Sequence, residues 1–350
     1  MKRIALTILA ACAVVGLKAE EDAAAAAAAQ TTAIGLTKYD MIVHDPVMIR
    51  EDGVYYLFTT GPGVTVWSSE DMIRWKREEP VFAEAPDWAK REVPGFNGHI
   101  WAPDISEHEG KFYLYYSISS FGKNNSCIGL AINETLDPSS EDFEWVDQGI
   151  VVQSHPGLNN WNAIDANLVE DDEGRPYLAF GSFWSGLKIG QLTEDRTRFM
   201  TPLDELITIA SRSPESVEQG REDGFPLEAG KGDIEGPFIV KRGDYYYLFA
   251  STGYCCRGRE STYRMVYGRS EKVTGPYLDK AGLDMTHGGG TLLLEGNDAW
   301  NGVGHNGVSR FDGVDYLVFH GYDASTKRGL PKLHVETLAW DEDGWPYVAD

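Results

Sequence analysis

The sequence predicts an all-β protein, specifically a five-bladed β-propeller, and two observations support this. First, one pattern occurs five times: a polar or acidic residue, a short apolar run, a turn with glycine, and an aromatic and aliphatic stretch that ends in small residues. Second, the copies recur about every 60 to 70 residues, an interval typical of an array or a propeller. The residues that open the five copies are Asp45, Asp104, Asp165, Glu235 and His305.

Each copy is expected to form two strands joined by a tight turn, because glycine tolerates the positive φ that hairpin turns require. The stretch after each turn, such as Tyr245 to Phe249, is apolar nearly throughout, which indicates a strand covered on both faces. Sheets stacked around a channel satisfy this condition, and the opening residues should then converge near the axis. The five turns are Glu51-Asp52-Gly53, Glu109-Gly110, Asp172-Glu173-Gly174, Arg242-Gly243 and Asp312-Gly313.

The blades can be placed along the chain. Arg212 to Lys231 is a polar insertion that lengthens the interval before the fourth copy. We expect blade one from about Met41 to Trp88, blade two from Trp101 to Gln153, blade three from Trp161, blade four from Gly232 and blade five from Asn301.

Composition limits the classes of partner. The chain has 350 residues, of which 42% are hydrophobic and 24% charged, as expected for one large globular domain. A formal charge of −23 disfavours nucleic acid and anionic membranes, because like charges would be brought together. It is compatible with a neutral ligand such as a carbohydrate. We expect a monomer.

The N-terminus has the features of an export signal. Lys2 and Arg3 precede an apolar run over residues 4–17 that is too short to span a bilayer. Residues 1–19 are therefore predicted to be a signal peptide, and the protein is predicted to be secreted or periplasmic.

A second processing route is also visible. Leu9-Ala10-Ala11-Cys12 resembles a bacterial lipoprotein box, in which residues 1–11 are removed and Cys12 is lipidated. We favour the ordinary cleavage site, because the apolar run before Cys12 is short. Residues 20–35 are an Ala-rich linker, and residues 36–350 form the predicted catalytic propeller.

Three cysteines remain after signal removal: Cys127, Cys255 and Cys256. They cannot form a full disulfide framework, and no cysteine or histidine spacing indicates zinc. The adjacent pair is either two reduced core thiols or, less often, a vicinal disulfide.

Two of the convergent carboxylates suit glycosidic hydrolysis, which needs one acid to protonate the leaving oxygen and one carboxylate to activate water. Asp45, in a polar setting before Pro46, is the candidate base. Glu235 has apolar neighbours that should raise its pKa, as a general acid requires. Asp165 is a third carboxylate that would raise the pKa of Glu235 further.

These residues stand in motifs that resemble glycoside hydrolase family 43, and within it the arabinanases. The resemblance extends from about residue 40 to the C-terminus. The matching segments are Val43-His44-Asp45-Pro46, Trp101-Ala102-Pro103-Asp104-Ile105, Ser120-Phe121-Gly122, Ile128-Gly129-Leu130-Ala131, Trp161-Asn162-Ala163-Ile164-Asp165, Gly181-Ser182-Phe183-Trp184-Ser185-Gly186, Asp233-Ile234-Glu235-Gly236-Pro237, Ser261-Thr262-Tyr263-Arg264, Gly268-Arg269-Ser270 and Gly304-His305-Asn306.

The resemblance implies an inverting hydrolase with Asp45 as base, Glu235 as acid and Asp165 as pKa modulator. It implies one calcium ion near His305 on the axis, and since calcium prefers oxygen ligands we expect it to be coordinated largely by water. Asp104 has no catalytic counterpart in the family and is expected to bond backbone at the start of a blade. The implied sugar-binding residues are His44, Trp101, Phe121, Gly122, Asn162, Ala163, Ile164, Ser182, Phe183 and Trp184.

Three functions fit this pattern. The leading hypothesis is endo-hydrolysis of α-1,5-L-arabinofuranosidic bonds in plant cell-wall arabinan or arabino-oligosaccharides. The second keeps the fold and carboxylates but acts from a chain end, as an α-L-arabinofuranosidase or β-xylosidase. The third is a catalytically silent sugar-binding propeller, which the presence of all three carboxylates disfavours. One residue is ambiguous on its own: Trp184 is either presented on its loop or a core residue at a strand end.

Overall fold

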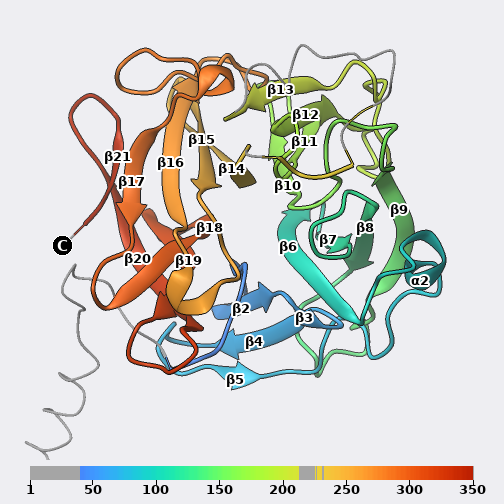
Figure 1. The fold of residues 1–350 in the computed structure, drawn as a ribbon. Helices are drawn as coiled ribbons and strands as arrows, with labels where there is room; N and C mark the ends of the chain where they lie inside the picture. The colour runs from blue at the N-terminus through green and yellow to red at the C-terminus, as the bar shows by residue number, and fades with distance from the viewer. Residues whose placement is uncertain (1–39, 213–224, 226, 231, 350) are drawn as a thin grey trace, which may run out of the picture.

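Five β-sheets surround a central axis in the computed structural model, which describes residues 40–212, 225, 227–230 and 232–349 (Figure 1). The predicted five-bladed β-propeller is confirmed. The predicted signal sequence with Cys12, the Ala-rich linker and most of the polar insertion lie outside the described residues. Within the described part of the chain, no helix is both long and apolar enough to cross a membrane.

The strands of each blade are consecutive in the chain, except that β3 of the first hairpin region joins the second sheet. Blade one contains β1 Val47–Glu51, β2 Val54–Thr59, β4 Thr65–Ser69 and β5 Lys76–Arg77, and blade two contains β3 Gly61–Pro62, β6 His99–His108, β7 Lys111–Ile118, β8 Ser126–Asn133 and β9 Val146–Ser154. Blade three contains β10 Asn167–Glu170, β11 Pro176–Phe180, β12 Leu187–Gln191 and β13 Ile207–Ala210. Blade four contains β14 Ile234–Arg242, β15 Tyr245–Thr252, β16 Arg264–Ser270 and β17 Thr291–Glu295, and blade five contains β18 Trp300–Phe311, β19 Val314–Asp323, β20 Leu330–Trp340 and β21 Pro346–Val348. The short helical turns are α2 Ala89–Glu92, η1 Gly258–Glu260 and η2 Met285–His287.

The predicted turn chemistry holds at the first hairpin. Glu51 pairs with Val54, so Asp52 and Gly53 form a two-residue loop, and both have positive φ, at 47° and 85°. This is the backbone of a type I′ turn, whose twist matches that of the strands. The turns at Glu109-Gly110 and Asp312-Gly313 have the same form.

The core consists of layers between neighbouring blades, because the second strand of each blade is apolar on both faces. In β15, Tyr246 and Leu248 pack in a cluster shared with blade three, whereas Tyr247 and Phe249 pack in a cluster shared with blade five. Among the described residues there are five such clusters, one between each pair of neighbouring sheets. The expectation that these strands are covered on both sides is therefore correct.

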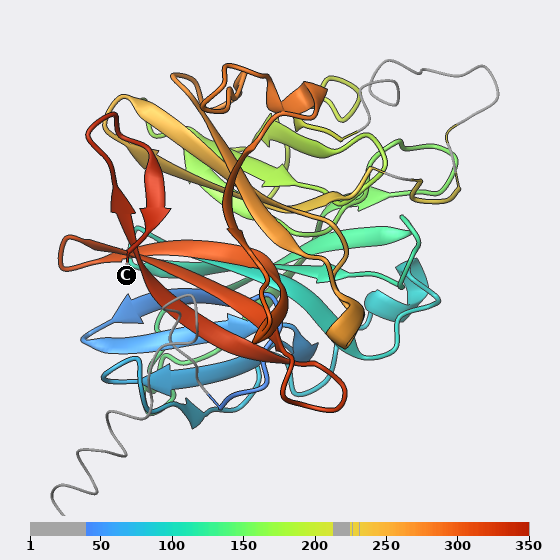
Figure 2. The same ribbon diagram turned by 60° about the vertical axis from the view of Figure 1, so that its left-hand side comes forward.

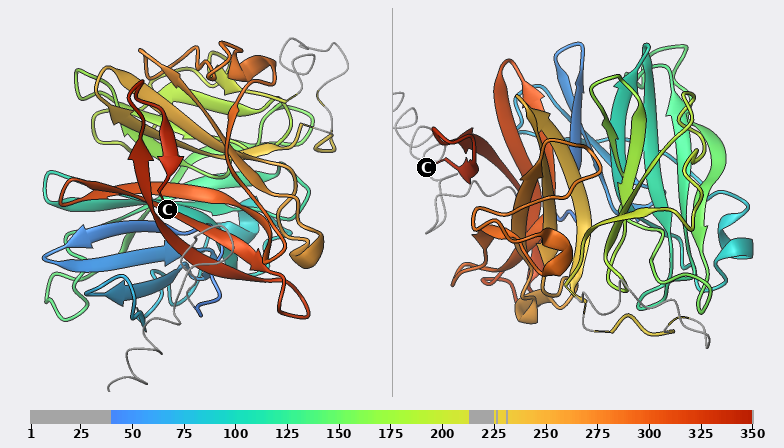
Figure 3. Two further views of the ribbon diagram at one scale, coloured as in Figure 1. Left: turned by 90° about the vertical axis from the view of Figure 1, so that its left-hand side faces the viewer. Right: turned by 90° about the horizontal axis from the view of Figure 1, so that it is seen from above.

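The ring closes where blade five meets blade one. Figures 2 and 3 show the blue N-terminal sheet beside the orange and red strands of the last blade. Ile42 forms a β-bridge with Lys332 of β20, and Val43 and Met48 pack with Leu333 and Val318. Closure therefore relies on side-chain packing, on this bridge before β1 and on polar contacts such as the ion pair of Arg50 with Asp312.

One residue at or near the start of each inner strand has a left-handed backbone, and its N–H bonds to the preceding blade. The acceptor is a polar side chain from the end of the preceding blade's second strand in four cases, and the Asp165 carboxylate in the fifth. The five bonds run from Asp45 to His320 (3.2 Å), Ala102 to Thr60 (2.8 Å), Asp165 to Ser117 (3.1 Å), Gly236 to Asp165 (3.2 Å) and His305 to Ser251 (2.8 Å).

This alignment corrects one detail of the sequence repeat. Ala102, not Asp104, occupies the left-handed position of blade two, and Glu235 lies one residue before its equivalent, Gly236. Register shifts in β6 and β14 account for these offsets, because a bulge inserts extra residues into one strand. Asp104 instead accepts bonds from the N–H of Leu168 at 2.7 Å and the amide of Asn167 at 3.3 Å, the structural role expected for it.

The free energy of unfolding of Asp104→Asn should increase relative to that of the parent as pH rises. Burial raises the pKa of Asp104 to about 7, although the bonds from Leu168 and Asn167 oppose this rise. The unfolded pKa is about 3.9, so between these values folding takes up a proton. The free energy of unfolding of the parent should then fall by about 1.4 kcal/mol per pH unit through this group, and Asp104→Asn should lack that fall.

The measurement is urea unfolding of both proteins at several pH values between about 4 and 7. All other groups titrate alike in the two proteins, so the difference between them isolates Asp104. A difference that stays constant with pH would contradict the prediction.

Candidate active site

Asp45 lies buried just before β1, where its left-handed backbone (φ 50°) precedes Pro46. One carboxylate oxygen, Oδ1, is 2.8 Å from Nδ1 of His44 and 3.1 Å from Nδ1 of His305. The other, Oδ2, accepts a hydrogen bond of 2.6 Å from the Thr60 hydroxyl. Blades one and five together therefore hold this carboxylate in one orientation.

The surroundings of Asp45 keep it ionised. Burial alone would raise its pKa, but the charge and hydrogen bond of His44 and the charge of His305 outweigh burial and hold the pKa well below its usual value. A carboxylate that must take a proton from water has to be ionised first. The electrostatics of Asp45 therefore suit the predicted base.

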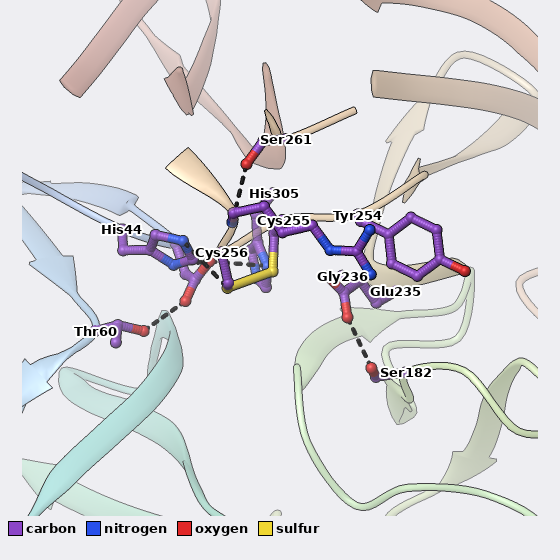
Figure 4. The surroundings of a disulfide bond; sticks show 12 residues. His44, Thr60, Ser182, Glu235, Gly236, Tyr254, Cys255, Cys256, Ser261 and His305 are labelled. Atoms are coloured by element: carbon purple, nitrogen blue, oxygen red, sulfur yellow. Dashed lines mark hydrogen bonds and ion pairs between the residues drawn. A yellow bond between two sulfur atoms is a disulfide. The ribbon is translucent and has the colours of Figure 1, made fainter. Parts of the chain in front are cut away.

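Glu235 lies buried on β14, opposite Ser251 of β15. The hydroxyl of Ser182 donates to its Oε2 at 2.8 Å (Figure 4). Burial raises the pKa of Glu235 and outweighs the hydrogen bond from Ser182 and the charge of His305, which lower it; the charge of Asp45 raises it further. This carboxyl is therefore suited to carry a proton.

Asp165 is the third buried carboxylate, and its Oδ2 accepts the N–H of Gly236, the residue after Glu235. Burial, and then the charges of Glu235 and Asp45, raise its pKa well above the usual value, while the bond from Gly236 opposes them. The structure thus brings Asp45, Asp165 and Glu235 from three blades into one electrostatically coupled group, as predicted. Tyr263 lies in the same field, since burial and the charges of all three carboxylates raise the pKa of its phenol.

Several predicted sugar contacts lie where a ligand could reach them. The side chain of Phe121 is 78% exposed on the loop between β7 and β8, next to exposed Gly122. Trp101 is half-buried on β6. Phe183 is also half-buried, and its ring centroid lies 5.9 Å from that of Tyr254 across the boundary between blades three and four.

Other predicted contacts are buried. Trp184 is only 5% exposed, so the loop does not present it, and it is a core residue of this turn. Ala163 and Ile164 are buried and would reach a sugar only through backbone atoms. The side-chain oxygen of buried Asn162 has no hydrogen-bond partner within the described structure, which leaves it open to water or a sugar hydroxyl. His44 is hydrogen-bonded to the base rather than free for substrate.

The surroundings of His305 fit calcium only in a hydrated form. Among the described residues, the histidine, cysteine and acid clusters close enough to share an ion all contain His44, and none contains His305. Nδ1 of His305 faces Asp45, so one imidazole nitrogen remains. The neighbouring Asn306 amide is buried with neither polar atom partnered, which fits adjacent water. An ion here would therefore be bound mainly through water.

Sequence reasoning missed the residues that hold Asp45 from blades one and five. Thr60 follows β2, and His320 and Tyr322 lie in β19. Tyr322 Oη is 2.8 Å from Nε2 of His44 and 3.3 Å from Nε2 of His320, so it connects the two rings. Several repeats have polar residues at the end of the second strand, and this pattern could have identified these residues. On its own, however, it indicates only where a strand ends.

The structure also decides the state of the adjacent cysteines. Cys255 and Cys256 form a disulfide in the loop between β15 and β16 (Figure 4). The pair is partly exposed rather than part of the core, and Cys256 Sγ lies 3.8 Å from Nε2 of His44. The alternative of two reduced core thiols is therefore wrong, and the bond lies beside the candidate base. Cys127 is free and buried.

The chain is similar to known proteins over nearly all of the described region. It matches the model for glycosyl hydrolases family 43 over residues 40–346. It is 51% identical over 306 residues to the extracellular exo-α-(1→5)-L-arabinofuranosidase ArbA of Cellvibrio japonicus (strain Ueda107), with 87% of this chain and 86% of the relative covered. It is 40% identical over 309 residues to the extracellular endo-α-(1→5)-L-arabinanase 1 of Bacillus subtilis (strain 168), with 87% of each covered.

A solved structure agrees with these matches. The α-L-arabinanase of Cellvibrio cellulosa, complexed with arabinohexaose, superposes with a TM-score of 0.83 at 50% identity and covers 89% of this chain and 96% of that one. Together with the five blades and the coupled carboxylates, these similarities show that the chain belongs to glycosyl hydrolase family 43.

Proposed function

We propose that this chain hydrolyses α-1,5-L-arabinofuranosidic bonds in arabinan and arabino-oligosaccharides, with inversion of configuration. The observation that carries the proposal is the opposite tuning of two carboxylates in one buried site. The pKa of Asp45 is held low among imidazoles, and the pKa of Glu235 is raised by burial. An inverting glycosidase needs these two ionisation states at the same pH.

In the proposed reaction, Asp45 accepts a proton from a water molecule that attacks the anomeric carbon, while Glu235 gives its proton to the leaving oxygen. Asp165 acts on Glu235 through charge, since coupling between two carboxylates is reciprocal: each raises the proton affinity of the other. The bond from the Gly236 N–H to Asp165 fixes the modulator beside the acid. Ser182 orients Glu235, and His44 and Thr60 orient Asp45.

The substrate class is supported by the names of relatives and by the aromatic residues near the site. The Cellvibrio japonicus and Bacillus subtilis relatives are described as acting on α-(1→5)-linked arabinose, and both are described as extracellular. The exposed ring of Phe121 offers a face on which a furanose could stack. We therefore propose that this enzyme is exported. The lipid at Cys12 and the monomeric state stay predictions.

Endo-action is the mode of attack that we propose first, and exo-action is a second candidate. The Bacillus relative, at 40% identity, is described as an endo-arabinanase, whereas the Cellvibrio relative at 51% identity is described as exo-acting. The catalytic carboxylates serve both modes equally. The difference must therefore lie in how loops shape the ends of the sugar site.

The products released early from linear arabinan should reveal both mode and stereochemistry. We expect oligosaccharides of mixed length from the first minutes, because internal bonds are accessible to an open site. The newly formed reducing ends should have the β configuration before mutarotation, since inversion converts the α-linkage.

Chromatography of early samples and proton NMR of the fresh reaction provide the two measurements. A single product size from the outset would reject endo-action and support the exo candidate. Initial α-anomers would reject inversion.

Replacing Glu235 by Gln should lower kcat by about 10²–10⁴-fold, because the amide cannot donate the proton that the leaving oxygen needs. Reducing-end release from arabinan measures the effect, and binding of arabinan to the variant should persist. The matched control is Glu260→Gln, which removes an exposed carboxylate from the neighbouring loop and should leave kcat unchanged.

This comparison also tests the silent-propeller alternative. If the parent binds arabinan but releases no reducing ends, and Glu235→Gln behaves identically, the protein is a sugar-binding module and not a hydrolase.

A calcium ion beside His305 remains part of the proposal, supported by the unpartnered Asn306 amide and the free nitrogen of the imidazole. Exhaustive chelation should lower the thermal unfolding midpoint by several degrees, and added calcium should restore it, since a ligand that binds only the folded state stabilises that state. Differential scanning calorimetry measures the shift. His305→Ala should be insensitive to the chelator. An unchanged midpoint of the parent after chelation would reject the ion.

A further inference from the structure

The loop between β15 and β16, residues 253–263, carries the Cys255–Cys256 disulfide to the edge of the base. The N–H of Cys256 donates to the hydroxyl of Tyr322 at 2.7 Å, and its Sγ lies 3.8 Å from Nε2 of His44. In the view of Figure 4 the sulfur atoms stand between His44 and the acid Glu235. A loop of blade four therefore contacts residues that belong to blades one and five.

The donor and acceptor roles in the hydrogen bonds around Asp45 can be followed from its backbone N–H. The backbone N–H of Asp45 can only donate, so Nδ1 of His320 accepts and its proton must be on Nε2, which faces Tyr322 at 3.3 Å. Tyr322 Oη then accepts from both His320 and Cys256, and it lies within hydrogen-bond distance of Nε2 of His44, at 2.8 Å. His44 in turn donates from Nδ1 to Asp45.

These bonds form a circuit that begins at the backbone of Asp45 and returns to its carboxylate. The circuit runs through His320, Tyr322 and His44, whose two imidazole rings also stack with centroids 3.9 Å apart. Within this circuit Tyr322 bonds to His320 and His44, and it also accepts the N–H of Cys256 from the disulfide loop. The N–H of Cys256 therefore helps to fix the position of the Tyr322 hydroxyl.

Cys256 has a left-handed backbone, with φ of 65°, which an ordinary side chain disfavours. The disulfide links it to its neighbour in a small ring through the peptide bond, and that ring restricts the backbone at this point. The rest of the loop has other anchors: the N–H of Arg257 donates to Ser261 at 3.1 Å, and the ring of Tyr254 lies against Phe183. Opening the disulfide should therefore release the segment around Cys256 rather than the whole loop.

We propose that the Cys255–Cys256 disulfide is a positioning element for the base: it holds the N–H of Cys256 on Tyr322, and Tyr322 holds His44 against Asp45. The inference rests on Asp45 being the base in the proposed function. The disulfide acts on the base indirectly, through the hydrogen bond that the N–H of Cys256 donates to Tyr322. The effect should appear in kcat, because a displaced base is poorly aligned with its water while sugar contacts elsewhere are retained.

The test uses the full-length oxidised enzyme and a dithiol reductant, which gives two electrons and two protons to the disulfide and becomes a disulfide itself. Thiol titration confirms that two thiols per chain are freed. Initial rates on linear arabinan before and after reduction give kcat and KM. We expect kcat to fall about tenfold with KM changed less than about twofold, and reoxidation to restore kcat.

Tyr322→Phe separates positioning from other roles, because it removes the hydroxyl that receives the N–H of Cys256. Its kcat should already be low in the oxidised state, and reduction should lower it less than twofold further. Cys127→Ser, which removes the remaining buried thiol of the described chain, should respond to reduction as the parent does. Circular dichroism before and after reduction checks that the propeller stays folded.

The outcomes are distinct. An oxidised parent that releases no reducing ends refutes the proposed function itself. An active parent whose kcat is unaffected by reduction refutes only the positioning role. If reduction raises KM alone, the disulfide is a sugar contact. If reduction lowers the kcat of Tyr322→Phe as much as that of the parent, the disulfide acts by a route other than Tyr322. Either result overturns the inference.

Discussion

The site depends on the backbone N–H groups of the left-handed residues that face the axis. A left-handed backbone costs an ordinary residue about 1–2 kcal/mol, and a buried N–H without a partner costs a similar amount. Asp45, Asp165 and His305 are not glycines, so their left-handed backbone is unfavourable by itself. It is stable only if the buried N–H also has a hydrogen-bond acceptor. Each acceptor comes from the preceding blade. The conformation that aims a functional side chain at the axis therefore exists only in the closed ring.

Blade four departs from this arrangement in a way that serves the chemistry. Its left-handed residue is Gly236, and the acceptor of the Gly236 N–H is the carboxylate of Asp165 rather than a serine or threonine. The polar residue that ends the equivalent strand region of blade three, Ser182, is thereby free to donate to Glu235. One exchange of partners between two blades places two carboxylates side by side and gives each a separate hydrogen bond. The hydrogen bond from Gly236 to Asp165 therefore both joins the two blades and brings the two carboxylates close enough to interact.

Repetition made much of this predictable. Local turn chemistry, such as Asp52 followed by Gly53, and strands without a polar face are sequence properties, and together they define five sheets packed against one another. Motif resemblance marked the three carboxylates. The offset of Asp104 escaped prediction because bulges leave no clear signal in spacing. The burial of Trp184 and the bond between Cys255 and Cys256 depend on loop conformation, which a pattern of residue types does not specify.

Two carboxylates within one buried site would ordinarily compete for ionisation, so their partners must differ in kind. Asp45 is surrounded by imidazoles, which can donate hydrogen bonds and bear positive charge, and these outweigh the cost of burial. Glu235 accepts a hydrogen bond from the uncharged hydroxyl of Ser182, and the effect of burial therefore dominates and raises its pKa. His320 stays neutral because burial and the charge of His44 lower its pKa, and this frees its Nδ1 to accept the N–H of Asp45. The neutral ring of His320 thus accepts the backbone N–H of Asp45. The ring of His44 faces the carboxylate and stabilises its negative charge, so the two imidazoles have different roles because, of the two, only His44 donates to the carboxylate.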